Sequence, residues 1–308
     1  MLEDESGRLR ITGTILQTSM LVTGCIVAMM GTENANGDFE VVDMKVPDLP
    51  RQPQRWERQD ADAALANGTK KLKMSGADRQ MGGKIAFISG IEISGDEGDN
   101  LALDLLMEYL VGENCSTDAQ TDVSSVSRLV IAGNSIKEAT PLAPRDELSD
   151  RKASKKYGYD STAYNPAPTA HLDDFLSTLL PSIPITLMPG ESDPANVSLP
   201  QQPIHPAMFP HSRAYANIPG SQDPGWLDSV TNPWEGDIEG WRMMGNGGQP
   251  INDVFKYVEG DEPLEMMESL LRWRCGAPTA PDTLCKTEKC VYALKILLTP
   301  CRVLSFPG

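Results

Sequence analysis

Strand-like and helix-like segments alternate between residues 84 and 188, and this alternation constrains the fold more than any other feature of the sequence. Strands are predicted over 84–93, 126–132 and 183–188, where β-branched and other apolar residues run together. Helices are predicted between them, over 99–111 and 169–180, where large apolar residues recur every three or four positions. The apolar side of the first helix is expected to consist of Leu101, Leu105, Leu106, Tyr109 and Leu110. This order indicates βαβ units, so we expect an α/β domain with a mainly parallel or mixed sheet and flanking helices.

Proline dominates the next part of the chain, where 11 of the 24 prolines fall between Pro181 and Pro233. Each proline fixes φ and removes a backbone donor, so we expect neither a helix nor a central strand there. An ordered loop of this length is expected to have a function or to form an interface. Two helices are predicted after it, over 250–258 and 263–274.

Short strands separated by glycine turns are predicted in the first 46 residues. We expect strands over 8–15, 20–30 and 39–46, with a bend at Gly24 and a hairpin turn over 34–37. This pattern is typical of a small all-β barrel or sandwich. Because it begins almost at the first residue, we expect the set of strands to be incomplete at its N-terminus.

The charge of the chain limits its partners. The 308 residues include 27 Lys and Arg against 43 Asp and Glu, a formal net charge of −16. Nucleic acids and anionic membranes are both bound by clustered basic side chains, so we expect no broad contact with either. No apolar run is long enough to span a bilayer, and no signal peptide is predicted, so the six cysteines are expected to be reduced thiols.

Polar residues and glycines follow each of the three strands predicted between 84 and 188. They are Ser89-Gly90-Ile91, Gly133-Asn134-Ser135 and Gly190-Glu191-Ser192-Asp193. In open α/β sheets, ligands bind beyond the carboxyl ends of the strands, where glycine permits close approach of the backbone. A ligand site of this chain is therefore expected at these strand ends.

Several segments resemble one known family. One is Leu187-Met-Pro-Gly-Glu-Ser-Asp-Pro194, which is followed by Leu199-Pro-Gln-Gln-Pro-Ile-His-Pro206, of the same length, and Met208-Phe-Pro210. Shorter ones are Leu2-Glu-Asp-Glu5, Gly13-Thr-Ile15, Leu21-Val-Thr-Gly24, Ala132-Gly-Asn134 and Pro278-Thr-Ala-Pro-Asp-Thr-Leu284. Together they resemble the small (B) subunits of DNA polymerase delta, within the B-subunit family of DNA polymerases alpha, delta and epsilon. The likeness extends over residues 2–284, apart from 47–81 and parts of 137–168.

The resemblance implies an OB-fold joined to a calcineurin-like phosphoesterase domain that has lost its metal ions. The expected domains are a partial OB-fold over 1–50, a flexible linker over 51–82 and an inactive phosphoesterase domain, incomplete at its C-terminus, over 83–284. An aberrant tail is expected over 285–308, where the likeness stops and three of the six cysteines lie. We expect this tail to pack poorly. A zinc site of Cys275, Cys285, Cys290 and Cys301 is the alternative, although these spacings fit no common zinc finger.

The strand-end residues depart from the pattern of an active phosphoesterase, which needs Asp-x-His, Gly-Asp and Gly-Asn-His-Asp after successive strands. In their place this chain has Ser89 and Ile91, then Asn134, then Glu191 and Asp193. Too few carboxylates and imidazoles remain to bind two divalent ions, so we expect no catalytic residue, no bound metal and no cofactor. The side-chain oxygens of Asn134, Glu191 and Asp193 remain, and a weak Mg²⁺ site formed by them is the alternative. With such a site, the chain would be a metal-dependent phosphodiesterase or nuclease.

The resemblance also implies a function. It indicates a non-catalytic accessory subunit that acts as a scaffold in the DNA polymerase delta complex in the nucleus. The implied partners are the cysteine-rich C-terminal region of the catalytic subunit and a further accessory subunit, with DNA contacted only indirectly and no membrane. The residues that contact these partners are not indicated by the sequence.

Histidines and aromatic residues offer further hypotheses. His205 is expected to bond to the backbone of its loop rather than to bind a metal, His171 to be solvated, and His211 to have no partner. The aromatic residues of 208–241 either anchor a partner or hold the loop against its own domain.

Overall fold

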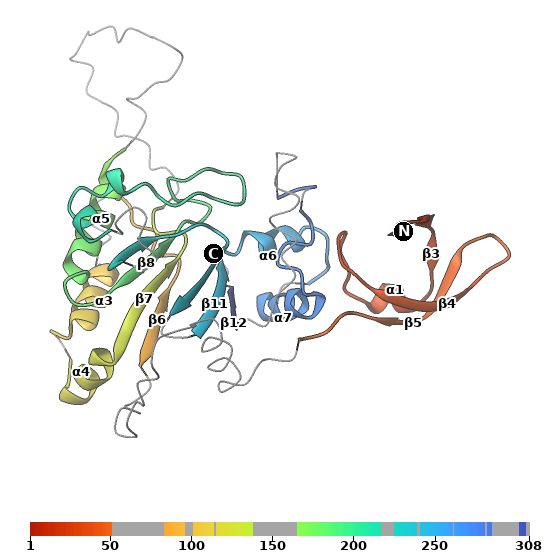
Figure 1. Ribbon diagram of the computed structural model, residues 1–308, viewed down its shortest axis with the longest axis horizontal. Coiled ribbons are helices and arrows are strands. Elements are labelled where there is room, and N and C mark those ends of the chain that lie inside the picture. The colour runs from red at the N-terminus through yellow and green to blue at the C-terminus, as the bar shows by residue number, and fades with distance from the viewer. Residues whose placement is uncertain are drawn as a thin grey trace, which may run out of the picture. The chain divides into compact units, whose positions relative to one another are not determined.

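The computed structural model describes residues 1–50, 83–95, 101–113, 115–137, 165–216, 225–238, 241–260, 262–280, 282–284 and 302–305. These residues divide into two compact units (Figure 1). Unit 1 contains 1–50, 198–200 and the described residues from 248 onward, and unit 2 contains the described residues of 83–197 and 201–247. The predicted linker over 51–82 lies outside the described residues. None of the described helices combines the length and apolar character needed to cross a membrane.

A four-stranded parallel sheet forms the centre of unit 2. Strands β6 (Lys84–Ile88), β7 (Val126–Ala132), β8 (Ile185–Met188) and β9 (Leu227–Ser229) lie side by side in this order. All of β8 and the last four residues of β7 are buried, as expected for central strands of a parallel sheet covered on both faces. The prediction that the first three strands form one parallel sheet is confirmed.

Helices α3 (Leu101–Val111), α4 (Thr117–Ser124) and α5 (Ala167–Leu179) lie together beside this sheet (Figure 1). Helix α5 has the predicted amphipathic pattern, because Leu172, Phe175, Leu176 and Leu179 are all buried in the core. Full burial of such a side chain stabilises the fold by about 1.5–3 kcal/mol. Helix α4 was not predicted; it begins after Ser116, whose hydroxyl accepts the Ala119 N–H at 3.4 Å.

The predicted apolar side of α3 is wrong in part. Leu110 is buried and Leu106 packs against the core, but Leu101, Leu105 and Tyr109 are exposed. The reason is that α3 has apolar residues on two sides, so spacing alone could not decide which side faces the sheet.

The proline-rich segment is largely irregular, as predicted, but it includes the edge strand β9, which was not expected. Two short 3₁₀ helices, η1 (Pro206–Met208) and η2 (Ser212–Tyr215), also lie in it. An edge position suits a strand in this segment, because an edge strand pairs on one side only. The antiparallel hairpin of β10 (Trp234–Ile238) and β11 (Trp241–Asn246) follows and was not predicted.

Unit 1 begins with short strands. A hairpin of β1 (Leu2–Asp4) and β2 (Gly7–Leu9) precedes a sheet in which β5 (Phe39–Lys45) lies between β3 (Ile11–Thr12) and β4 (Ala28–Glu33). The predicted turn over 34–37 is confirmed, since the Gly37 N–H donates to the Asn34 carbonyl at 3.0 Å and Gly37 has φ +80°.

Two of the N-terminal strands were predicted too long. The strand expected over 8–15 ends at Thr12 and gives way to the short helix α1 (Ile15–Thr18). The strand expected over 20–30 begins only at Ala28, because the chain turns around Gly24, which has φ +95°.

Helices α6 (Gln249–Val254) and α7 (Pro263–Trp273) complete the described core of unit 1. Ile251, Leu270 and Trp273 are buried with Cys275, and side chains of 20–25 and Val46 pack against them. Burial raises the pKa of the Cys25 thiol in this cluster to about 11. The apolar faces of α6 and α7 pack against the N-terminal segment and group the described residues of 248–284 with unit 1, and the domain bounds of 83–284 stay a prediction.

The predicted tail is described only over β12 (Arg302–Ser305), which is a strand. The rest of 285–308, including three of the four cysteines of the zinc alternative, lies outside the described residues.

Candidate functional site

The carboxyl ends of β6, β7 and β8 meet at one edge of the parallel sheet. Beyond this edge, the loop after β6 stays paired with the loop after β7. The Gly90 N–H donates to the Gly133 carbonyl at 3.2 Å, and the Ile93 N–H donates to the Ser135 carbonyl at 2.9 Å. These two loops are therefore joined through their backbones where a ligand site was expected.

Asp193 lies at the centre of this edge and is only 5% exposed. Its Oδ1 accepts the backbone N–H groups of Ser135 at 2.8 Å and Ile136 at 3.0 Å, and its Oδ2 accepts the Gly190 N–H at 2.7 Å. Burial raises the pKa of Asp193 above its usual value, although the backbone donors oppose the rise. The carboxylate thus holds the loop after β7 against the loop after β8.

The backbones of these two loops approach each other closely at Gly133 and Gly190. A Cβ atom on Gly190 would lie 2.3 Å from the backbone N of Asn134, and one on Gly133 would lie 2.9 Å from the Gly190 Cα. Asn134 Oδ1 faces Ser192, whose N–H and hydroxyl lie 3.4 and 3.3 Å away.

The structure brings only two of the five predicted positions, Asn134 and Asp193, into this contact. Ser89 donates its hydroxyl to the Ala132 carbonyl at 3.1 Å, and Ile91 packs against the hydrophobic core. Glu191 is exposed to solvent. Within the described part of the chain, no group of three His, Cys, Asp or Glu residues is placed to hold a metal ion.

A buried pair of amides at the same edge was missed by sequence reasoning. Gln201 and Asn232 are 1% and 0% exposed, and the Asn232 Nδ2 donates to Gln201 Oε1 at 2.9 Å. The same nitrogen donates to the Pro189 carbonyl, while Gln201 Nε2 donates to the Gly190 carbonyl, both at 2.9 Å. The pair therefore ties the proline-rich segment to the loop after β8. A glutamine between prolines was the only signal available in the sequence.

Each of the three histidines has a polar partner. His205 Nδ1 accepts the Ala207 N–H at 3.1 Å, which confirms its predicted bond to loop backbone. The prediction for His211 is wrong, because its Nδ1 lies 3.4 Å from Asp173 and 3.3 Å from Asp174. His171 is not simply solvated either, since its Nδ1 lies 3.3 Å from the Ser94 carbonyl.

Aromatic residues of the proline-rich segment divide between the two hypotheses. Phe209 is fully buried in the core and holds the segment against its own unit. Tyr215 and Trp226 are 37% and 48% exposed, so these two rings are accessible to a partner.

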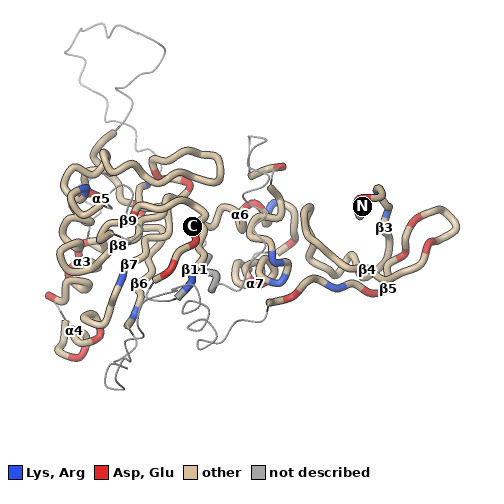
Figure 2. Tube along the Cα trace, viewed as in Figure 1, with Lys and Arg blue, Asp and Glu red and all other residues tan. Residues whose placement is uncertain are grey.

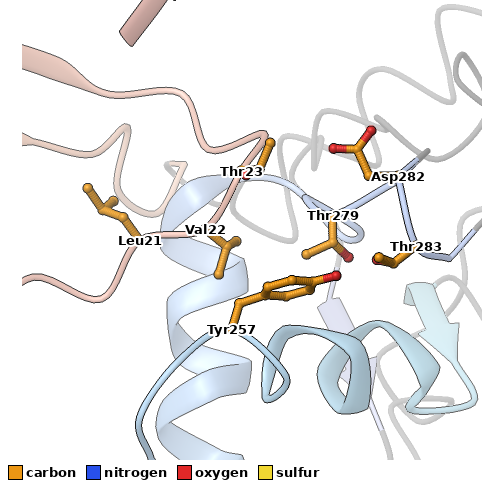
Figure 3. A pocket seen from close by; sticks show the side chains of 7 residues that line it. All are labelled: Leu21, Val22, Thr23, Tyr257, Thr279, Asp282 and Thr283. Atoms are coloured by element: carbon orange, nitrogen blue, oxygen red, sulfur yellow. The ribbon is translucent and has the colours of Figure 1, made fainter. Parts of the chain in front are cut away.

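Unit 1 contains a pocket of about 190 Å³ lined by Leu21, Val22, Thr23, Tyr257, Thr279, Asp282 and Thr283 (Figure 3). The Thr279 and Thr283 hydroxyls donate to Asp253, which also pairs with Lys256 at 3.0 Å. Burial alone would raise the pKa of Asp253, but these hydrogen bonds and the lysine charge hold it below its usual value. Both hydroxyls are thus engaged in holding the 279–283 turn on α6, and the pocket carries no catalytic constellation.

Comparisons with known proteins place these observations in a family. The sequence model of the B subunit of DNA polymerase alpha/epsilon matches residues 85–294, which is ten residues beyond the predicted end of the likeness at Leu284. The model of the DNA polymerase delta subunit OB-fold domain matches residues 1–44.

Individual relatives give the same result. The chain is 32% identical to proteins named DNA polymerase delta small subunit from Oryza sativa subsp. japonica, Arabidopsis thaliana and Saccharomyces cerevisiae. In each case the match covers 92% of this chain and 57%, 56% and 55% of the relative, respectively. The chain thus spans about half the length of the curated relatives it matches.

Proposed function

Because this chain belongs to the B-subunit family of DNA polymerases alpha and epsilon, we propose that it is a non-catalytic accessory subunit of DNA polymerase delta. The names of its relatives support the choice of complex. The observation that supports a non-catalytic role is the strand-end edge, where Asp193 is engaged by three backbone donors and the loops touch at Gly133 and Gly190.

The proposed role is a scaffold in the nucleus. The chain would join the cysteine-rich C-terminal region of the catalytic subunit to a further accessory subunit, and its net charge of −16 favours only indirect contact with DNA. Within this proposal, unit 2 is a phosphoesterase-like domain, which the parallel sheet of β6 to β9 supports. The N-terminal strands are part of an OB-fold, which the match over residues 1–44 supports.

Co-purification tests this function. When the full chain is co-expressed with a tagged DNA polymerase delta catalytic subunit, we expect the two to elute together in equal amounts from a sizing column. A catalytic subunit that lacks its cysteine-rich C-terminal region is the control and should not retain the chain. Free elution of the chain beside the intact catalytic subunit would refute the proposal.

Metal titration tests the absence of catalysis. Isothermal titration of the full chain with Mn²⁺ should give no tight binding, and a chromogenic phosphodiester should not be turned over, because the described residues include no group of three His, Cys, Asp or Glu that could hold an ion. The paired variants are Asn134→Ala at the edge and Glu191→Ala in solvent. Micromolar binding of two ions, or a turnover that Asn134→Ala abolishes and Glu191→Ala spares, would favour the phosphodiesterase alternative.

A further inference from the structure

Helix α3 exposes a stripe of large apolar side chains. Leu101, Leu105 and Tyr109 are 72%, 55% and 48% exposed. They are spaced four residues apart, so they lie along one side of the helix. We name these three residues the α3 stripe.

The exposure of the stripe is not caused by a loosely packed helix. Leu103, Leu106 and Met107 pack against the hydrophobic core, and Leu110 is buried in it. At 100° per residue, these positions lie on the side of α3 opposite the stripe. The helix is therefore anchored by one apolar side and presents a second one, which is uncommon for a helix that only covers a sheet.

The surroundings of the stripe are acidic. Residues 101–125, which include α3 and α4, contain five acidic residues and no Lys or Arg: Asp104, Glu108, Glu113, Asp118 and Asp122. Figure 2 shows the acidic positions along α3 and α4. Asp122 is paired with Lys84 of β6 at 2.8 Å. Asp104 and Glu108 flank the stripe, since they lie three positions after Leu101 and Leu105 on the helix.

A pocket of about 300 Å³ opens where α3 ends. Its lining includes Leu110 and Val111 of α3, Gln120 and Val123 of α4, and Ile183, which precedes β8. Leu110 lies on the side of α3 that faces the core, and no residue of the stripe lines the pocket, so the pocket is separate from the surface that the stripe presents.

We propose that the α3 stripe and its acidic surroundings form the docking surface for a basic amphipathic helix of another subunit. The apolar side of that helix would cover Leu101, Leu105 and Tyr109, and its Lys and Arg residues would face Asp104 and Glu108. Amphipathic helices commonly bind in this way, through apolar residues at positions i, i+4 and i+7 or i+8. Complementary charges beside the apolar contact then determine which partner binds. The identity of the occupant as a subunit of the polymerase complex rests on the proposed function.

A peptide assay tests the surface itself. The probe is a fluorescent 18-residue Leu/Lys amphipathic peptide, and its binding to the full chain is measured by anisotropy. We expect the triple variant Leu101→Ser/Leu105→Ser/Tyr109→Ser and the double variant Asp104→Lys/Glu108→Lys each to weaken binding about tenfold or more. Because all these side chains except Glu108 are exposed, the variants should fold, which circular dichroism verifies.

Matched controls remove equivalent groups elsewhere on unit 2. Val197→Ser removes an 87% exposed apolar side chain, and Glu191→Lys/Asp237→Lys makes the same change of charge at exposed positions. Neither control should alter peptide binding. Equal binding of a sequence-scrambled peptide, or of a Leu/Glu counterpart, would overturn the proposed chemistry, and so would unchanged binding by both α3 variants.

An assembly assay tests the occupant. The wild-type chain and the triple variant are each co-expressed with the other subunits of the complex, and the retained subunits are quantified. We expect the variant to lose one subunit that the wild type retains. Failure of the wild type to assemble would refute the proposed function and leave the peptide result standing. Full assembly by the variant, or a homodimer seen by light scattering that the variant abolishes, would refute the proposed occupant.

Discussion

Replacing Asp193 by alanine is expected to destabilise unit 2 by about 3 kcal/mol. The substitution leaves the backbone N–H groups of Ser135, Ile136 and Gly190 without their acceptor, and a buried donor without a partner costs about 1–3 kcal/mol. Relief from burying a carboxylate offsets part of this loss. Thermal unfolding of the full chain measures the change, and amide hydrogen exchange at these three residues locates it.

Asp193→Asn is the matched variant, because its amide oxygen can keep the two bonds to Ser135 and Ile136. Its NH₂ group would face the Gly190 N–H, and because both are donors this hydrogen bond is lost. We therefore expect the free energy of unfolding to fall by about 1–2 kcal/mol. Unchanged stability of Asp193→Ala, with protection of the three amides intact, would show that the carboxylate does not hold the loops together.

The stability of the wild type and that of Asp193→Asn should depend differently on pH. Burial raises the pKa of Asp193, so the folded state disfavours the ionised carboxylate relative to the unfolded chain. The wild type should therefore lose stability as the pH rises from the ordinary aspartate pKa of about 4 to the raised folded value. Asp193→Asn lacks this group, so the stability difference between the two proteins should narrow over that interval as the pH rises.

The parallel sheet could be predicted because each of its first three strands is rich in apolar residues and a glycine follows within two positions of its end. The helix between the last two of these strands was equally clear, since Leu172, Phe175, Leu176 and Leu179 form one buried stripe. Helix α4 has no such stripe, because Val123 is its only buried residue. Its start depends on the Ser116 cap, which resembles many serines in turns.

The candidate site could be located from the sequence but not interpreted fully. The missing imidazoles and carboxylates could be read directly from Ser89, Ile91 and Asn134. The role of Asp193 could not, because its partners are backbone N–H groups, which have no sequence signature. The same holds for Gln201 and Asn232, which lie 31 positions apart in the chain and meet only through the fold.

The division of the chain into units was also beyond pattern reasoning. Helices α6 and α7 follow unit 2 in sequence, and their amphipathic pattern predicts that they have apolar faces without naming the surface they bury against. The structure packs Trp273 and Leu270 with side chains from the segment around Gly24. The contact between these distant segments depends on how closely their backbones can approach, which a single substitution can test.

Replacing Gly24 by alanine is expected to disrupt this contact severely. Gly24 has φ +95°, and a Cβ atom there would lie 1.9 Å from the Pro278 carbonyl oxygen and 2.9 Å from the Pro278 carbonyl carbon. Both are backbone atoms, so the overlap cannot be relieved by a side-chain rotation. The left-handed backbone strain costs about 1–2 kcal/mol, and the overpacking costs about 1–3 kcal/mol. Together they are expected to lower the free energy of unfolding by up to about 5 kcal/mol.

Gly37→Ala separates the two contributions. Gly37 has φ +80°, yet a Cβ atom there would meet nothing nearer than the Glu33 carboxylate at 4.0 Å, so this variant has the strain without the overlap. We expect it to lose only about 1 kcal/mol. Differential scanning calorimetry of the full chain should then show the transition of unit 1 shifted much further down by Gly24→Ala than by Gly37→Ala. Equal shifts would mean that the close approach of Gly24 to Pro278 does not hold the N-terminal segment against the α6–α7 region.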